Sequence, residues 1–490
     1  MTTIGQFSML SETPWNPSLV TLAMTLKGPP FTASDFIKAW QTQEMVDRHP
    51  RFHWTVSTQY PGHFDATRQS SFELPVSDSL KPLESKERED LLARLTLAQL
   101  TPLELTKSLW KVQIVPNVTQ GLVPSSKTAK GESRSIILWQ SHHVLADGVS
   151  LGAALLDLAD EAPAMRAQIR AAVQKRRSRE KSWWQRLWKK FLLALWILLG
   201  SIPVFWNQFK LMVANWAPHP WRTLQKLVGG QEPSRTLACT SAGTVAQAKW
   251  VAQTLSRGQK KKLKITINDV FVSVITSALI RQLKEHRERL HARLPVDAEA
   301  APSPLVAQHY MTVVIPVHLR GGVLLPEDSV GNKIGAFGVR VPAENELLTP
   351  VERLHQVHRA LQAVKQSPAP FWSFGIATAV TKLLPSSWAS YIFKHSSAGA
   401  TVVVTNVKGP DKALHYQGRE VEAVHGFIPI PPGIPVGVTI NSYNGKINLG
   451  LTAESWAVPD GDRFLSFVLE EYLKLVRAAK DVSKGQTGSE

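Results

Sequence analysis

The chain has a single cysteine, Cys239, in 490 residues, so it cannot form an internal disulfide and does not need an oxidising compartment to fold. Its N-terminus lacks a basic segment followed by an apolar run, so no secretory signal is expected. It is poor in acidic residues, with 39 Asp and Glu against 56 Lys and Arg, a formal charge of +17. A hydrophobic fraction of 43% excludes a chain that is disordered throughout.

The basic surplus predicts an anionic partner, which can be nucleic acid, acidic lipid headgroups or a phosphorylated ligand such as coenzyme A. Nine Lys and Arg lie between positions 170 and 190, directly before an apolar run. Cations next to an apolar segment favour lipid headgroups over nucleic acid, and no nucleic-acid-binding motif occurs elsewhere. A membrane lipid surface is therefore an expected partner and nucleic acid is not; a solvated basic linker is the alternative.

The apolar run covers residues 191–209, which include no charged residue but contain Gly200 and Pro203. Seven of the 16 Trp lie in 183–221, and Trp beside Lys at the ends of an apolar run is typical of an interfacial anchor. About 20 apolar residues can span a bilayer once, but a span would separate the two halves of the chain. We therefore predict a bent, monotopic segment on the cytosolic face of the endoplasmic reticulum, with a single crossing or a buried core helix as alternatives.

Hydrophobic periodicity predicts two α/β halves. The expected division is an N-terminal domain over 1–175, a basic and apolar linker over 176–240, a second domain over 241–480 and a polar tail over 481–490. Asn444-Gly445 between two alternating runs predicts a β-hairpin. Strands are expected at 19–26, 110–115, 135–140, 310–319 and 401–405, an extended segment at 52–56, and helices at about 32–46, 85–99, 149–160, 268–285, 350–365 and 461–479.

The strand at 135–140 is followed by the motif His142-His143-x-x-x-Asp147-Gly148 and then by a helix. A neutral imidazole can take a proton from a hydroxyl as that hydroxyl attacks an acyl carbon. Asp147 is expected to pair with a cation and fix the loop, and Arg320, at the end of a strand, is the candidate partner. The alternatives are a pair of structural histidines and an ordinary surface arginine. No metal-ligand spacing is present, so no metal is expected.

Five ordered segments accompany this motif: RHPRFHW at 48–54, Ser108-Leu109-Trp110, Asn268-Asp269-Val270, Gly331-Asn332 and the segment Thr405 to Pro410. With them, the chain resembles the wax ester synthase/diacylglycerol acyltransferase family of the CoA-dependent acyltransferase superfamily, although Ser108 stands where that family usually has proline. The resemblance implies two chloramphenicol-acetyltransferase-like α/β domains that face each other across an active-site tunnel, joined by a membrane-associating linker.

The resemblance also implies roles for individual residues. His143 would be the general base and His142 would orient it. Asn268 would line the tunnel with support from Asp269, although Asn268 can also be read as a helix N-cap. The remaining candidate substrate-binding residues are Trp110, Gly148 and Asn406.

The implied reaction is the transfer of a fatty acyl group from acyl-CoA to a long-chain alcohol or to diacylglycerol, through a ternary complex and without a cofactor. A non-catalytic lipid-binding protein on the same fold is one alternative. Another is a serine lipase or esterase, because Gly148-x-Ser150-x-Gly152 fits a nucleophile elbow. That elbow requires the serine directly after a strand, whereas Ser150 is expected to begin a helix.

Overall fold

The structure is a computed structural model of the 490-residue chain. It describes the chain except for residues 14, 60–61, 66–72, 80–86, 120, 124–132, 180–183, 258–263, 292–309, 320–328, 344–347, 397–398, 488–490 and most of 185–233, where 187–188, 191–192, 194–200, 202 and 206 are described.

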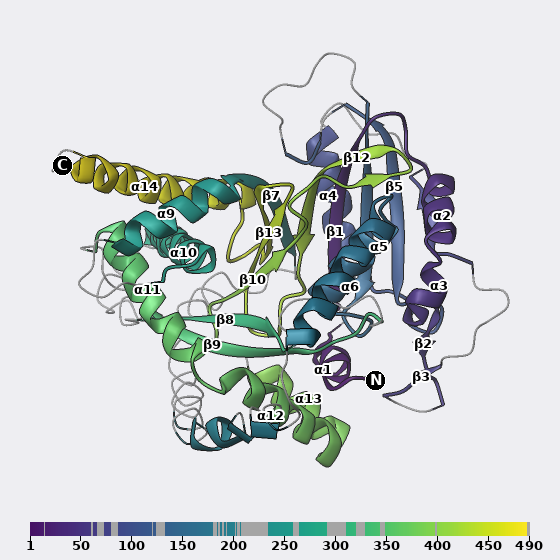
Figure 1. The fold of residues 1–490 in the computed structure, drawn as a ribbon, viewed down its shortest axis with the longest axis horizontal. Coiled ribbons are helices and arrows are strands. Elements are labelled where there is room, and N and C mark those ends of the chain that lie inside the picture. The colour runs from purple at the N-terminus through teal and green to yellow at the C-terminus, as the bar shows by residue number, and fades with distance from the viewer. Residues whose placement is uncertain are drawn as a thin grey trace.

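Two six-stranded sheets lie side by side at the centre of the molecule (Figure 1). The first has the order β11-β12-β1-β6-β5-β4 and the second β7-β14-β13-β10-β8-β9, while β2 and β3 form a separate small sheet. The strands are β1 Leu19–Lys27, β2 Thr55–Val56, β3 Phe64–Asp65, β4 Val76–Asp78, β5 Trp110–Val118, β6 Arg134–His142, β7 Arg235–Thr244, β8 Tyr310–His318, β9 Ile334–Pro342, β10 Val402–Lys408, β11 His415–Tyr416, β12 Arg419–Phe427, β13 Val436–Tyr443 and β14 Lys446–Glu454.

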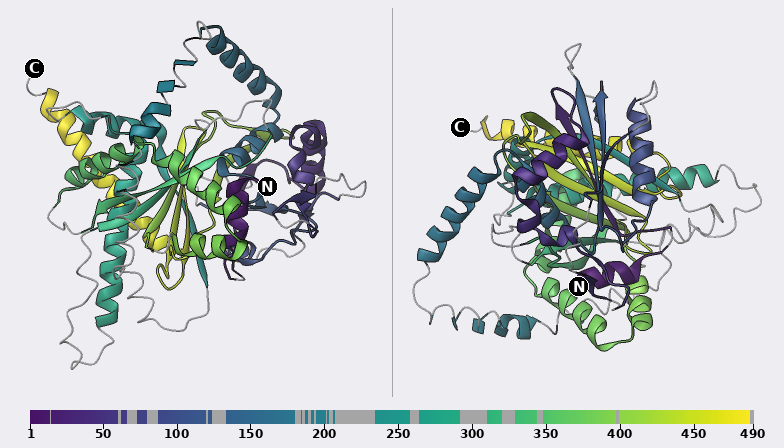
Figure 2. Two further views of the ribbon diagram at one scale, coloured as in Figure 1. Left: turned by 90° about the horizontal axis from the view of Figure 1, so that it is seen from below. Right: turned by 90° about the vertical axis from the view of Figure 1, so that its right-hand side faces the viewer.

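Helices cover both sheets, and Figures 1 and 2 place the N-terminal helix beside α12 and α13. The helices are α1 Thr3–Ser11, α2 Ala33–Thr42, α3 Met45–Arg48, the 3-10 helix η1 Pro50–His53, α4 Glu87–Leu100, α5 Gly148–Leu158, α6 Ala162–Arg179, α9 Val245–Arg257, α10 Ile267–His291, α11 Pro350–Lys365, α12 Ala369–Leu383, α13 Ser386–Ser396 and α14 Gly461–Thr487.

The strand pairing crosses the predicted domain boundaries. β11 and β12 come from the predicted second domain, yet β12 pairs antiparallel with β1 and so extends the first sheet. This pairing satisfies the backbone groups that would otherwise lie open along one edge of β1. At the other boundary, β7 begins at Arg235, inside the segment expected to be linker. The second half of the sequence therefore contributes two strands, β11 and β12, to the first sheet.

Local packing explains where the expected elements hold and where they do not. The helix expected over 32–46 has the predicted polar cap at Thr32 but breaks after α2, because Glu44 takes a left-handed φ of 53°. The segment expected to be extended over 52–56 begins instead with η1, which buries Phe52 in the core. The predicted hairpin is confirmed, with Asn444 at φ 47° and Gly445 at φ 70° between β13 and β14.

The apolar run 191–209 is described only in part. Among the described residues, no helix combines the length and the hydropathy that a membrane crossing requires. Residues 194–200 are helical, and Leu198 and Leu199 are exposed by 68% and 66%. The alternative of a buried core helix is therefore wrong for these residues, because their apolar side chains face solvent.

Candidate active site

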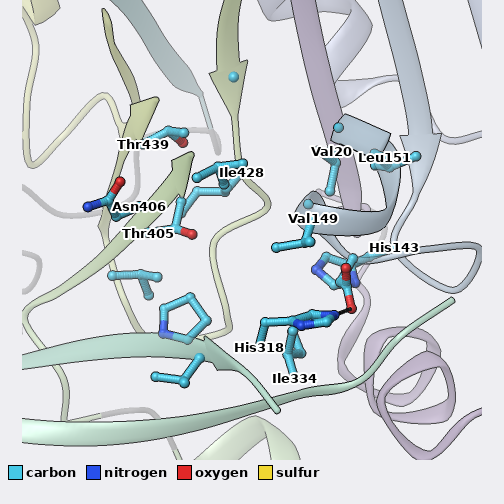
Figure 3. A pocket seen from close by; sticks show the side chains of 18 of the residues that line it. Val20, His143, Val149, Leu151, His318, Ile334, Thr405, Asn406, Ile428 and Thr439 are labelled. Atoms are coloured by element: carbon cyan, nitrogen blue, oxygen red, sulfur yellow. Dashed lines mark ion pairs between the residues drawn. The ribbon is translucent and has the colours of Figure 1, made fainter. Parts of the chain in front are cut away.

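A large cavity of about 1360 Å³ reaches from the first sheet to the second. It is lined mainly by aliphatic and aromatic side chains, including Val20 and Leu151 from the first half and Ile334 and Ile428 from the second (Figure 3). A cavity bounded by both halves can hold one substrate against each half.

The two adjacent histidines separate at the end of β6. Successive side chains of an extended strand point to opposite faces, so only one of two neighbouring residues can face the cavity. That residue is His143 (Figure 3). Its Nδ1 atom is buried, which leaves Nε2 as the nitrogen available to a ligand. Burial lowers the pKa of His143 below its ordinary value of 6.5, outweighing the opposing effects of its own backbone and Asp147, so the imidazole is neutral near pH 7.

His142 points away from the cavity. Its Nε2 atom lies 2.8 Å from Oε1 of Glu12, and its Nδ1 atom accepts a hydrogen bond of 3.0 Å from the backbone N–H of Val144. Glu12 also accepts from the N–H of Ser18, whose carbonyl accepts from the N–H of His143. His142 therefore helps to hold the loop backbone, and its electrostatic effect also lowers the pKa of His143. The sequence contains no motif around Glu12 that would have identified it.

Asp147 fixes the other end of the loop and is 1% exposed. Its carboxylate caps α5 by accepting from the N–H of Ser150 at 2.9 Å, and it accepts from the N–H of Lys333 at 2.9 Å. His318, at the end of β8, lies beside it, with Nε2 3.7 Å from Oδ2 (Figure 3). The predicted partner Arg320 lies outside the described residues, and His318 was not anticipated although it stands two positions before it.

The segment 331–333 of the second half holds this loop from the opposite side. The carbonyl of Gly331 accepts from the N–H of Asp147 and from the hydroxyl of Ser150. The side-chain Nδ2 of Asn332 donates to the carbonyls of His143 at 2.7 Å and Val144 at 3.2 Å. The Gly-Asn pair recognised in the sequence is thus the contact through which the second half positions the histidine loop.

The serine alternative does not fit this geometry. Ser150 is 2% exposed, is absent from the cavity lining and uses its hydroxyl to bind a backbone carbonyl. Cys239 is equally unsuited as a nucleophile, because burial raises the pKa of its thiol to about 12. Of the candidates considered, only His143 offers a base to the cavity.

Of the residues predicted from the second half, Asn268 lines the cavity and Asp269 holds the helix that carries it. Asn268, at the start of α10, lines the cavity, and it is not the N-cap, because Asp269 exchanges hydrogen bonds with Thr266 there. Asp269 is fully buried and binds Nδ1 of His358 at 2.8 Å and Nζ of Lys365 at 3.0 Å. It therefore ties α10 to α11 behind Asn268.

Two of the remaining candidates line the cavity and one does not. Gly148 lies at the start of α5, and Asn406 lies on β10 across the cavity from His143 (Figure 3). Trp110, which is expected to bind substrate, does not line this cavity. Its side chain is fully buried, stacks on Trp40 with ring centroids 4.8 Å apart and donates from Nε1 to the carbonyl of Phe52. The alternation of β5 points Trp110 into the aromatic core, away from the cavity.

Among the described residues, no group of three or more His, Cys, Asp or Glu side chains is arranged to hold a metal ion.

Comparisons with known proteins agree with this architecture. A family model described as the WS/DGAT C-terminal domain matches residues 330–475. Wax ester synthase/diacylglycerol acyltransferase 11 of Arabidopsis thaliana is 24% identical over 413 residues, which cover 80% of this chain and 76% of that protein. The O-acyltransferase WSD of Acinetobacter baylyi is 25% identical over 217 residues, 44% of this chain and 42% of that protein.

The solved wax ester synthase/diacylglycerol acyltransferase from Marinobacter aquaeolei has the same fold, with a TM-score of 0.57 at 15% identity, and the likeness covers 97% of this chain and 98% of that one. The predicted fold of two acyltransferase domains is thereby confirmed. The chain is thus similar to the wax ester synthase/diacylglycerol acyltransferase family in the family model over residues 330–475, in sequence and in fold.

Proposed function

We propose that this protein is an O-acyltransferase that moves a fatty acyl group from acyl-CoA to a long-chain alcohol, to diacylglycerol, or to both. The observation that carries the proposal is the position of His143. It is a neutral base in an apolar cavity shared by the two halves. The family relationship supplies the substrate classes, since the relatives are named as wax ester synthases and diacylglycerol acyltransferases.

In the proposed reaction, Nε2 of His143 takes the proton of the acceptor hydroxyl while the hydroxyl oxygen attacks the thioester carbon of acyl-CoA. The tetrahedral intermediate then collapses, the carbon–sulfur bond breaks, and the imidazolium returns the proton to the departing CoA thiolate. The products are an ester and free CoA, and His143 ends as it began. The thioester supplies the driving force, so the proposal requires no metal, ATP or other cofactor.

The size and lining of the cavity support a ternary complex. Its volume of about 1360 Å³ exceeds the roughly 300–1,000 Å³ of ordinary small-molecule pockets. Two long aliphatic substrates need such a space, and an apolar lining keeps out the water that would hydrolyse the thioester. A serine lipase is disfavoured by the position of Ser150. A non-catalytic lipid-binding protein would have no use for a half-buried, unprotonated histidine that faces the cavity.

The exposed apolar side chains of the segment 191–209 support a second part of the proposal, a monotopic association with the cytosolic face of the endoplasmic reticulum. Apolar and Trp-rich surface flanked by cations is expected to insert into one leaflet. With epitope tags at both ends of the chain in sealed microsomes, protease should remove both tags without detergent. Protection of one tag alone would contradict the monotopic arrangement.

The catalytic proposal is tested with the purified chain, labelled acyl-CoA and either hexadecanol or diacylglycerol, with ester formation measured by chromatography. His143→Ala should lose about 10²–10⁴-fold in turnover. His415→Ala is a matched control, because that imidazole binds Glu161 at 2.5 Å and does not line the cavity. A His143→Ala enzyme with normal turnover would overturn the mechanism, and loss of activity in Ser150→Ala alone would favour the hydrolase.

The pattern of the initial-rate plots tests independently whether both substrates are bound at once. Because no covalent nucleophile faces the cavity among the candidates considered, both substrates must be bound together, and initial-rate plots should intersect. Parallel lines or an isolable acyl-enzyme would contradict direct transfer.

A further inference from the structure

Helices α12 and α13 form a hairpin that closes one end of the cavity together with α1. The rings of Phe7 on α1 and Phe393 on α13 meet edge to face at 4.7 Å, and the hydroxyl of Ser390 donates to the carbonyl of Leu10. Side chains from all three helices line the cavity, among them Phe7, Val380 and Ile392. The inner faces of these helices therefore form part of the cavity wall.

The outer face of the same hairpin is apolar and exposed. Leu383 and Trp388 are exposed by 78% and 66%, and Phe371, Ile376 and Tyr391 are also exposed. Ile376 belongs to both surfaces, since it lines the cavity and is 49% exposed. We refer to these five residues as the α12–α13 face. Large exposed apolar patches on a folded protein mark a site of interaction, and Ile376 connects this one to the cavity lining.

The α12–α13 hairpin itself carries lysines and no acidic residue. The sequence contains no Asp or Glu between positions 353 and 410, whereas Lys382 and Lys394 lie within the hairpin. Exposed Trp and Tyr beside Lys are the side chains favoured at a bilayer surface, where the rings occupy the headgroup layer and the cations meet anionic lipid. A second copy of this face is a poorer occupant, because a two-fold interface would bring the same cations together.

A second apolar surface adjoins this face. A Cβ placed on Gly200 would lie only 2.7 Å from Cδ of Pro368, so the helical residues 194–200 pack closely against the start of α12. Figure 1 shows this helical segment beside α12, on the far side of the hairpin from the sheets. The exposed Leu198 and Leu199 therefore extend the apolar surface next to the α12–α13 face.

We propose that the α12–α13 face is a docking surface for an anionic lipid bilayer, and that the lipid acceptor enters the cavity from that bilayer past Ile376. The second clause rests on the acyl transfer proposed above, whereas the first does not. Docking in this orientation places the exposed Ile376, which also lines the cavity, at the bilayer surface, so a diacylglycerol or long-chain alcohol can move past it into the cavity without crossing water.

The test uses the full purified chain in flotation with vesicles of phosphatidylcholine containing phosphatidylserine. The variant L383E/W388E places two carboxylates on the α12–α13 face, and its partition into these vesicles should fall at least about tenfold. The matched control is L97E/L473E, which makes the same charge change at exposed leucines of α4 and α14 and should bind as the wild type does. The milder L383S/W388S should show a smaller loss and guards against a folding defect, which circular dichroism would reveal.

Assays with two different acceptors distinguish a failure of the docking proposal from a failure of the acyl-transfer proposal. With a water-soluble short-chain alcohol as acceptor, L383E/W388E should keep wild-type turnover, because His143 is untouched. With diacylglycerol in the vesicles, its KM should rise about tenfold with the partition loss. If the wild type transfers no acyl group to either acceptor, the proposed function fails, and flotation still decides the docking surface.

Two results would overturn the docking proposal. One is L383E/W388E floating as well as the wild type. The other is a wild-type dimer, seen by light scattering, that the variant dissociates while vesicle binding stays unchanged, since the face would then be occupied by a second copy.

Discussion

Replacing Asn332 by alanine tests whether the second half of the molecule positions the histidine loop. Asn332 is 1% exposed, and its Nδ2 donates to the carbonyls of His143 and Val144. The asparagine touches the loop backbone and does not line the cavity, so it is a positioning residue. Its removal leaves His143 chemically intact but free to move.

The expected magnitude follows from the two hydrogen bonds. Each contributes about 0.5–1.5 kcal/mol net, so Asn332→Ala should lower the free energy of unfolding by about 1–3 kcal/mol. A displacement of a reacting group by about 1 Å can cost roughly 100-fold in rate, so kcat should fall by about 10–100-fold. Asn332→Asp, which keeps the shape but replaces the donor by an acceptor, should be at least as damaging.

The assay is turnover at saturating substrates, combined with denaturant unfolding of the same samples. Gln43→Ala is the matched control, because the buried Gln43 donates to the carbonyl of Ala159 from a site outside the cavity. That control should lose comparable stability and keep kcat. Asn332→Ala with lowered stability and an unchanged kcat would refute the positioning argument.

Three further predictions concern individual side chains. Because burial lowers the pKa of His143, kcat/KM should rise with pH through an apparent pKa below 6.5 and stay level at neutral pH; a limb above 7 would contradict a neutral base. Burial also lowers the pKa of His425 to about 4, so between pH 4 and 6.5 the unfolded chain binds a proton that the folded chain does not. The free energy of unfolding should therefore rise with pH across that window by roughly 3 kcal/mol. Denaturant titrations of His425→Gln should lack this pH dependence. Trp110→Ala should cost about 3–5 kcal/mol of stability through loss of core packing, with KM for either substrate unchanged in the folded fraction; a selective KM effect would restore a binding role.

The candidate site was predictable where its residues are close in sequence. A strand, two histidines, a turn carboxylate and a helix are consecutive, so local structure alone brings His143 and Asp147 together. The supporting residues were not predictable in the same way. Glu12 and Asn332 contact the loop from 130 and 189 positions away. Asn332 could be singled out only by family resemblance, and its contact with the loop carries no periodic signal.

The sequence alone does not decide the role of Trp110, because a tryptophan in a recognised motif can serve either binding or packing. The register of β5 decides between the two by turning the ring toward Trp40 and Phe52. Similarly, the hairpin α12–α13 was missed, since its apolar residues cover one face toward the cavity and another toward solvent. Such a distribution lacks the single apolar stripe from which a surface helix is recognised.

What the sequence determined by itself is the set of features governed by local sterics and short-range hydrogen bonds. The Thr32 cap, the left-handed turn at Asn444 and Gly445 and the alternation of the central strands all depend on neighbouring residues. Tertiary structure alone decided that β12 joins the first sheet, that His143 rather than His142 faces the cavity, and that His318 meets Asp147. These outcomes depend on which distant strands pair and in which register. Pairing and register are determined by the burial of a whole face of each sheet, which no short stretch of sequence specifies.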